Sequence, residues 1–372
     1  MAYTFENGKI VAVQGDVRPG VIEKEFTLLS DMGNARAGTK VMLAVAPSDT
    51  SQSTELETYL GGYTQNGMGQ DLLSPIVPID KESSKRRDFS HLNTFAPADD
   101  RVGRSGAINQ IEHISDVIEF KTEEHALAAF ISFAAENDAV GGYNVRAAHA
   151  KMIRDKLDLN REIRRFDTAT SVGTWNPNNY TTITTNYRWN TGTSKDPLAD
   201  IRARLKYSWS HVTGIFMNLE VAGYFLSDTK VKAAADFVLG TATMKNGLVV
   251  DSSTPGVQMF RLPSLPPFYV VDSKKYVSST MSPILADDVI LVNQPVVLSG
   301  GDTLASFLSF RYRGRSGTGY TVNEYQPAGR GLNGGTMLEA GYADADVTPG
   351  TSADGSITSR IGGLIKGVLT GT

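Results

Sequence analysis

Residues 144–168, NVRAAHAKMIRDKLDLNREIRRFDT, decide how the rest of the chain can be arranged. Apolar side chains recur there at helical spacing, at positions Val145, Ala148, Met152, Leu159, Ile163 and Phe166. This spacing predicts a helix with one narrow apolar face. The remaining positions are dense with Arg, Lys and Asp. A helix of this length is a rod of about 36 Å, and its narrow apolar face predicts that it lies across a surface rather than within a core.

The residues just before this helix predict a strand and then a second helix. Residues 114–121 have the apolar and β-branched character of a strand, and Gly141-Gly142 ends the segment that follows. Thr122 is suited to an N-cap, and Glu123 and Glu124 would lie where the helix dipole favours negative charge. We therefore expect a helix over residues 122–136.

The residues after the long helix predict a mixture of helices and strands. Asp196 followed by Pro197 is a strong helix start, and the helix continues at helical spacing through Leu198, Ile201, Leu205 and Trp209. Further helices are expected at residues 221–226 and 230–239, and strands at residues 215–219, 268–271, 289–292, 295–298 and 306–312. This half of the chain therefore indicates an α+β protein.

The first third of the chain contains little that could form a core of its own. Residues 1–74 hold short strand-like runs at 9–13 and 40–46 between turn residues, which predicts an extended arm. Residues 75–111 are polar, charged and interrupted by proline. A solvated loop is the usual explanation of such a run. Because structureless loops of this length are uncommon in compact domains, an extended hairpin that reaches a neighbouring chain is a second hypothesis.

Composition excludes several classes of protein. The 372 residues carry 36 basic and 40 acidic side chains, for a net charge of -4, so a basic face that coats nucleic acid is not expected. The absence of cysteine excludes disulfides, thiolate metal sites and cysteine nucleophiles. No signal peptide or membrane-spanning segment is predicted.

Motifs for catalysis fail on their context. The run from Gly329 to Gly334 fits GxGxxG, but no predicted strand precedes it and no helix follows. Residues 33–40 resemble a phosphate-binding loop with Thr39 and Lys40 in reversed order. The five histidines do not have zinc-ligand spacing. We therefore predict no catalytic residues, no cofactor and no metal. An ordinary α/β enzyme is a weaker hypothesis than the two shell proteins considered below.

Two stretches resemble the major capsid proteins of tailed bacteriophages. The segment TEEHALAAFIS, with the Gly/Asn break and the helix containing KLDLNREI (156–163), is similar to that family's strand, short helix and long spine helix. Trp189 followed by SKDPLADI (194–201) resembles the family's Trp, Asp-Pro and helix. The closing GGLIK (362–366) is also similar. The likeness covers residues 112–245 well and the rest loosely.

The resemblance implies the Hong Kong 97-like capsid fold. Its first three parts would be an N-terminal arm (1–74), an extended E-loop (75–111) and a peripheral domain (112–170) with a spine helix at 144–168. The chain would continue through the axial domain (171–297) and a return through the peripheral domain (298–325). A Gly-rich segment (326–372) would complete the axial domain. The candidate contacts between subunits are basic residues of the loop and the spine: Lys81, Lys85, Arg86, Arg87, Arg101, Arg104, Arg161 and Arg165. In some relatives a lysine of the E-loop is covalently joined to an asparagine of a neighbouring subunit. Lys81 and Lys85 are candidates for such a bond only by their location in the loop.

The resemblance also implies partners. We expect hexamers and pentamers of this chain in an icosahedral virion shell around double-stranded DNA, assembled in the host cytoplasm. A portal protein, decoration proteins and weak contacts with packaged DNA would accompany it, and no membrane. Residues 1–74 show no heptad pattern, so we expect an uncleaved N-terminus and a separate scaffolding protein or none. The alternative is the shell of a bacterial encapsulin-like nanocompartment.

Overall fold

The computed structural model describes fourteen stretches of the chain, and all structural statements below concern them. They are residues 2–6, 9–14, 51–52, 56, 68–89, 115–138, 144–239, 249–251, 257–262, 264–294, 305–313, 319–327, 334–348 and 359–369. The chain divides into two compact units, Met1–Ser48 and Asp49–Thr372. In the first unit, β1 (Ala2–Glu6) pairs antiparallel with β2 (Lys9–Gln14), which confirms the strand expected at 9–13. The strands expected at 40–46 and 295–298 lie outside the described residues.

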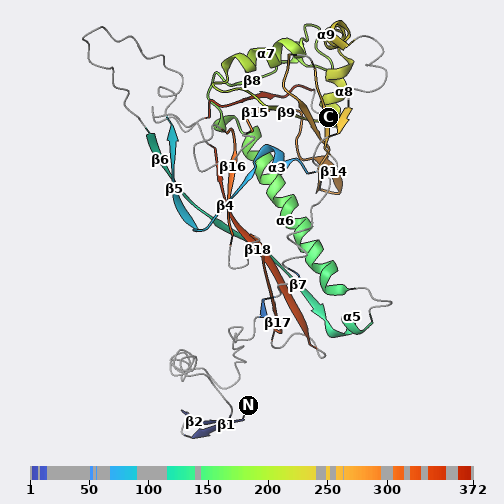
Figure 1. Ribbon diagram of the computed structural model, residues 1–372. Helices are drawn as coiled ribbons and strands as arrows, with labels where there is room; N and C mark the ends of the chain where they lie inside the picture. Colours follow the sequence, from blue (N-terminus) through green and yellow to red (C-terminus); the bar gives the residue numbers. More distant parts are fainter. Residues whose placement is uncertain are drawn as a thin grey trace, which may run out of the picture. The chain divides into compact units, whose positions relative to one another are not determined.

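The second unit contains helices and strands in alternation (Figure 1). Its described helices are α3 (Gln70–Leu73), α5 (Phe133–Asn137), α6 (Val145–Thr170), α7 (Pro197–Tyr207), α8 (Leu219–Ser227) and α9 (Thr229–Leu239), with short 3-10 turns at Val172–Thr174 and Thr185–Tyr187. Its described strands are β3 (Ser51–Gln52), β4 (Ile76–Ile79), β5 (Ser83–Phe89), β6 (Ser115–Lys121), β7 (Glu123–Ser132), β8 (Tyr180–Thr182), β9 (Gly214–Asn218), β10 (Val249–Asp251), β11 (Gln258–Phe260), β12 (Phe268–Val271), β13 (Lys274–Val277), β14 (Thr280–Pro283), β15 (Val289–Val292), β16 (Leu308–Tyr312), β17 (Thr321–Tyr325), β18 (Gly335–Val347) and β19 (Gly363–Lys366).

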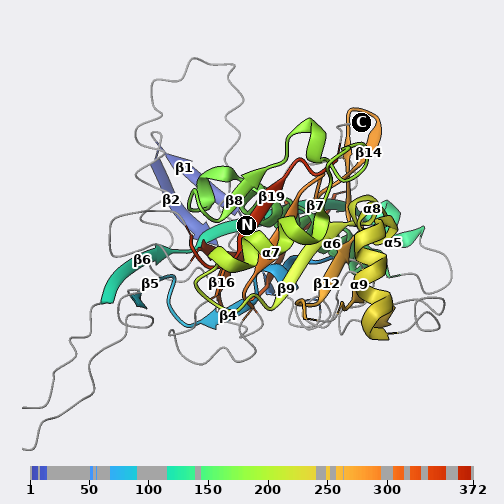
Figure 2. The ribbon, with the colours of Figure 1, turned by 90° about the horizontal axis from the view of Figure 1, so that it is seen from above.

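A seven-stranded mixed sheet has the order β10-β11-β12-β9-β15-β19-β8, and its central strands β9 and β15 are buried on both faces. Successive residues of β9 point to opposite sides: Ile215 and Met217 pack in one apolar cluster, and Phe216 packs in the other. The first cluster also contains side chains from α7, α8 and α9, which lie over the sheet in the view of Figure 2. The second contains Phe166 and Ala169 from the end of α6. Continuous apolar strands are what a sheet covered on both faces requires.

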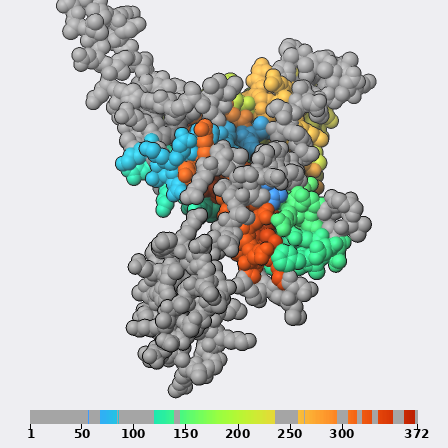
Figure 3. All heavy atoms as spheres, turned by 60° about the horizontal axis from the view of Figure 1, so that its bottom comes forward, coloured from blue at the N-terminus to red at the C-terminus, as the bar shows by residue number. Residues whose placement is uncertain are grey.

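A second sheet, in the order β3-β17-β18-β16-β4, is organised around the long strand β18. β7 also pairs with β18, over ten residues from Glu123 opposite Asp344 to Ser132 opposite Gly335. Figure 3 shows the β7–α5 segment packed beside the residues of β17 and β18. The first half of α6 covers one face of this sheet through Ile153. This sheet and the seven-stranded sheet are therefore both in contact with the same helix.

The long helix α6 confirms the expected element and corrects its expected orientation. Asn144 caps it, because its side-chain oxygen accepts a hydrogen bond from the Ala147 N–H at 3.0 Å. The predicted apolar face is wrong at Met152, whose residue is 44% exposed. The buried face instead carries charged side chains among the apolar ones, at Ala150, Ile153, Arg154, Leu157, Asp158, Arg161, Glu162, Arg165, Phe166 and Ala169. The rod is therefore embedded between packed elements, and its buried charges need partners.

The helix expected over residues 122–136 is wrong for most of its length. Residues Glu123–Ser132 form the strand β7, and only Phe133–Asn137 are helical, capped by the Ser132 hydroxyl. The alanines and Leu127 have little β preference of their own. Pairing with β18 along the whole segment overrides that local preference, because it adds cross-strand side-chain packing that an exposed helix would lack.

The Asp196-Pro197 helix start is confirmed by α7. The Asp196 carboxylate accepts a hydrogen bond from the Ala199 N–H at 3.1 Å, and Pro197 is the first helical residue. The strands expected at 268–271 and 289–292 coincide with β12 and β15. Local signals therefore predicted this half of the unit well.

We expect Asp196→Ala to lower the free energy of unfolding by about 1 kcal/mol, because the cap hydrogen bond is lost. Urea unfolding followed by circular dichroism measures this. Asp196→Asn is the matched control: it keeps a capping oxygen and loses only an exposed ion pair with Lys230. A loss in Asp196→Asn as large as in Asp196→Ala would assign the effect to the ion pair instead.

A two-stranded arm consists of β5, within the expected E-loop, and β6, just after it. β5 pairs antiparallel with β6, from Ser83 opposite Lys121 to Phe89 opposite Ser115. In Figure 1 the pair projects away from the larger sheets. The expected E-loop, 75–111, thus begins with β4 in the second sheet and continues as β5, and its residues 90–111 lie outside the described part.

The two described strands of the expected Gly-rich segment 326–372 belong to different sheets. β18 is the central strand of the second sheet, whereas β19 lies between β15 and β8 in the seven-stranded sheet. The described part of this segment therefore contributes strands to two different sheets. Among the described residues, α6 and the other helices include none long and apolar enough to span a bilayer.

Candidate functional site

The buried face of α6 forms a charged cluster with the second sheet. Asp344 of β18 has a side chain only 2% exposed, and three guanidinium groups surround it. Its Oδ2 lies 3.6 Å from Arg161 Nε, 3.5 Å from Arg165 Nη2 and 3.4 Å from Arg311 Nη2. A buried carboxylate with three cationic neighbours is strongly coupled to all of them. Asp344 is therefore the centre of this cluster.

Two further carboxylates complete the balance of charge around the arginines. Arg161 donates to Asp71 Oδ1 at 2.7 Å, and Arg165 contacts Asp346, which lies two residues beyond Asp344 on the same face of β18. Arg165 also donates to the Ser309 hydroxyl. Burial, together with the Arg161 guanidinium, lowers the pKa of Arg165 to about 9, which leaves it charged at neutral pH.

Tyr320 links the cluster to the first half of the helix. Its hydroxyl accepts from Arg311 at 2.8 Å and donates to Asp158 at 3.3 Å, and Asp158 in turn accepts from Arg154 at 2.6 Å. The Arg154 guanidinium lies 3.8 Å from the centre of the Tyr320 ring, a cation–π geometry. Burial raises the pKa of Tyr320 to about 12, so the phenol stays protonated and can donate. The helix is thus held to the sheet by a continuous polar network.

Glu162 lies on the same helix but outside that network. Its Oε1 accepts from the Gly69 N–H at 3.1 Å and from the Ser273 hydroxyl at 2.6 Å. Burial raises the pKa of Glu162 to about 7, although both hydrogen bonds lower it. This carboxyl group therefore titrates near neutrality.

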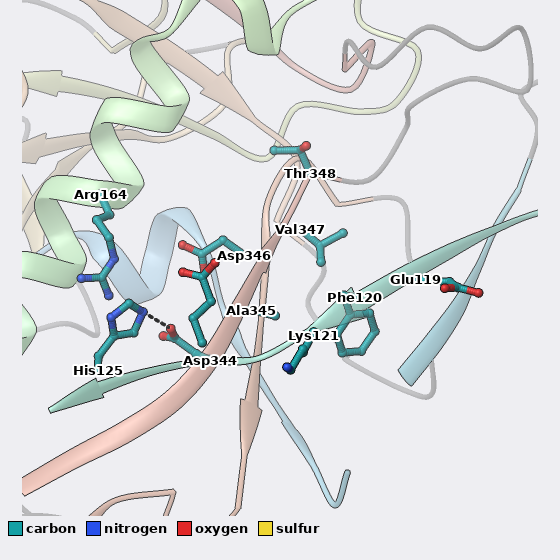
Figure 4. Close-up of a pocket in the computed structure, with 11 residues that line it drawn as sticks. Glu119, Phe120, Lys121, His125, Arg164, Asp344, Ala345, Asp346, Val347 and Thr348 are labelled. Carbon is teal, nitrogen blue, oxygen red and sulfur yellow. Dashed lines mark ion pairs between the residues drawn. The ribbon is translucent and has the colours of Figure 1, made fainter. Parts of the chain in front are cut away.

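A cavity of about 580 Å³ opens where the arm joins the second sheet (Figure 4). Side chains from β6, β7, α6 and β18 line it, including Lys121, Glu123 and Arg164. His125 points at the charged cluster, with Nε2 3.4 Å from Asp344 Oδ1. Burial and then the Arg164 guanidinium lower the pKa of His125. Charges of both signs line the cavity, so it does not select one charged ligand.

The residues expected at contacts between subunits divide into four groups. Lys81 and Lys85 are exposed, and Lys85 pairs with Glu119 across the arm. Arg86 and Arg87 lie in β5 opposite Ile118 and Val117; Arg101 and Arg104 lie outside the described residues.

The fourth group is buried. Arg161 and Arg165 are 1% and 4% exposed, and their ion pairs are with carboxylates of their own chain. Sequence reasoning also missed Asp344 and Arg311. The alternation Ala343-Asp344-Ala345-Asp346 was the one signal, since it predicts two carboxylates on the same face of a strand.

The cluster is suited to holding elements together rather than to a reaction. Its arginines cannot act as bases near neutral pH, and its carboxylates are engaged by cations. Within the described stretches, His, Asp and Glu side chains form no group of three that could hold a metal ion. The arrangement fixes the helix against the sheet.

Comparison with known proteins identifies the fold. No protein-family model and no curated protein sequence matches the chain. The chain is similar to the crystal structure of a phage-related protein from Bordetella bronchiseptica RB50, at 13% identity over 85% of this chain and 96% of that one, with a TM-score of 0.59.

Other matches include a capsid structure of the cyanophage P-SCSP1u (8% identity, 82% of this chain, 89% of that chain, TM-score 0.47). The holo-SrpI encapsulin complex from Synechococcus elongatus PCC 7942 also matches (8% identity, 84% of this chain, 94% of that chain, TM-score 0.46). The match to the phage-related protein shows that the chain shares the mixed α+β fold of that protein.

Proposed function

We propose that this chain is the major capsid protein of a tailed phage, which assembles as hexamers and pentamers into an icosahedral virion shell around double-stranded DNA. The observation that carries the proposal is the β5–β6 arm on a body of this fold. Its two strands pair only with each other over the described residues, so their outer edges offer unpaired backbone groups. A neighbouring subunit would cover them, and many such contacts add up around a closed shell.

The base of the arm is fixed to the body. Phe120 stacks on Phe310 of β16 with ring centres 4.4 Å apart, and Thr122 donates from its N–H and hydroxyl to the Glu82 carbonyl at 2.8 and 3.1 Å. A strand pair held at one end can present the rest of its length in a defined direction. This supports a role for Lys81 and Lys85, together with Arg86, Arg87, Arg101 and Arg104 of the same loop, at contacts between subunits.

The proposed partners follow from a shell. They are further copies of this chain, a portal protein, a separate scaffolding protein and decoration proteins. Packaged DNA would touch the inner surface only weakly, because the net charge of the chain is -4.

Negative-stain microscopy of the purified chain, alone and with a candidate scaffolding protein, tests the proposal. We expect hollow, closed shells of phage size. Small shells that contain an enzyme would favour the nanocompartment alternative. A chain that stays monomeric under both conditions and binds a small ligand would contradict both.

We expect Lys85→Glu to reduce shell formation at least tenfold while changing the stability of the single chain by less than about 1 kcal/mol. The Lys85 and Glu119 side chains are 69% and 68% exposed, and exposed ion pairs contribute little to folding. The swap Lys85→Glu with Glu119→Lys restores the pair within the arm. Recovery of assembly in the swap would show that only the pair matters, whereas persistent loss would place Lys85 at a contact with a neighbour.

A further inference from the structure

Glu162 joins three segments that are distant in the sequence. Its Oε1 accepts hydrogen bonds from the N–H of Gly69, directly before α3, and from the hydroxyl of Ser273, directly before β13. The residue is fully buried, and its Oε2 has no hydrogen-bond partner among the described residues. One carboxyl group of the long helix therefore fastens two other segments to it.

Ser273 lies at the base of an exposed hairpin. Its carbonyl accepts from the Ile284 N–H at 2.9 Å, which closes the β13–β14 pair. Among the described strands, these two join no larger sheet, and the facing side chains of Tyr276 and Met281 are 70% and 62% exposed. An isolated two-stranded hairpin is marginally stable by itself, so its position depends on what holds its base.

The surroundings of Glu162 favour the neutral carboxyl group. Asp71 of α3 disfavours its ionisation, Arg161 of α6 favours ionisation, and the hairpin presents the uncharged Ser273 hydroxyl. Burial outweighs both hydrogen bonds, because a charged and partly unpaired carboxylate away from water is costly. Burial of Glu162 beneath the two joined segments therefore favours its neutral form. By linkage, the neutral form of Glu162 stabilises the junction of these segments with the helix.

We propose that Glu162 is a proton-controlled latch: while neutral it holds the α3 segment and the base of the β13–β14 hairpin against the long helix, and its ionisation loosens both. The proton passes to solvent, and no other group changes state. This inference concerns the single chain and is independent of the proposed shell.

The sign of the pH dependence follows from the direction of the shift. The pKa of Glu162 is raised from 4.5 to about 7 in the folded chain. The latch contributes fully below pH 4.5 and is progressively lost as the pH rises to about 7 and beyond. With these two values, opening of the junction should be about tenfold more frequent at pH 8 than at pH 6.

Hydrogen–deuterium exchange of the whole chain at pH 6 and pH 8, corrected for intrinsic rates, tests the latch. We expect amides at 68–74 and 273–284 to lose about tenfold protection at pH 8, while those of α7 serve as an internal control. Glu162→Gln, which keeps an acceptor without a titratable proton, should abolish this difference. Equal protection at both pH values in the unaltered chain, or an unchanged difference in Glu162→Gln, would overturn the proposal.

A second variant keeps the test decisive if Glu162→Gln does not fold. The Ser273 hydroxyl lowers the pKa of Glu162, so in Ser273→Ala the loss of protection should shift to higher pH. Ser282→Ala, in the same hairpin, is the matched control and should leave the transition where it is. A transition that does not move in Ser273→Ala also overturns the proposal.

Discussion

Asp344→Asn should unfold at a much lower urea concentration than the unaltered chain, with a loss of about 3–5 kcal/mol in the free energy of unfolding. The substitution keeps the size of the side chain and removes only its charge. Arg161, Arg165 and Arg311 would then lose the carboxylate they share. Guanidinium groups without that compensation repel one another in a place that water does not reach, so the helix–sheet contact weakens.

The matched control is Asp272→Asn, which removes an aspartate that is half-exposed and 3.5 Å from Lys274. We expect it to change stability by less than about 0.5 kcal/mol. Adding Arg311→Met to Asp344→Asn should recover part of the loss, because one uncompensated cation is removed. A loss below about 1 kcal/mol in Asp344→Asn, or no recovery in the double variant, would show that the cluster is not coupled through this carboxylate.

Phe225→Ala should cost about 3–5 kcal/mol of stability, the second largest effect that we expect from one substitution. Phe225 of α8 is fully buried, and its ring lies 5.1 Å from that of Phe268 and 5.7 Å from that of Trp189. Removing it leaves a cavity between α8 and the seven-stranded sheet, and the surrounding rings are too rigid to fill it. Thermal unfolding followed by near-ultraviolet circular dichroism would report both the stability and the loss of ordered aromatic packing.

Leu219→Ala provides the control from the same helix, because Leu219 is 50% exposed. A change of less than about 0.5 kcal/mol is expected there. If both variants lost the same stability, the cause would be a general weakening of α8 rather than the aromatic core.

Elements with strong local signals could be predicted from the sequence. α6 has a cap at Asn144 and a charged helical pattern, and α7 has both Asp196 and Pro197 at its start. These features act within a few residues, so they are visible without knowledge of the fold. The buried strands at 268–271 and 289–292 were similarly evident from their continuous apolar runs.

The strand β7 could not be predicted in this way, because its stability comes from a distant partner. Residues 123–132 have helical composition, and only their pairing with residues 335–344 makes a strand the better structure. The local sequence of neither segment indicates that the other segment is its pairing partner. The same limit applies to β18 and β19, which are close in sequence but belong to two different sheets.

The charged cluster was hidden for a related reason. Arg161 and Arg165 were expected on the surface because charged residues are seldom buried without partners. Their partner Asp344 follows them by almost two hundred residues, so the compensation is apparent only in three dimensions. Among the candidate contact residues, Lys81 and Lys85 are exposed, whereas Arg161 and Arg165 are buried.

The position of β19 has a consequence for synthesis of the chain. β19 lies between β15 and β8, antiparallel to the former and parallel to the latter, and its Leu364 and Ile365 fill apolar clusters on opposite faces of the sheet. During synthesis, β8 therefore lacks its neighbour β19 until nearly two hundred further residues have been made. Contacts so distant in sequence form slowly, and the unfinished sheet exposes strand edges in the meantime. A nascent chain interrupted before residue 363 would lack the strand that joins the two edges, so prematurely terminated products should be open to proteolysis.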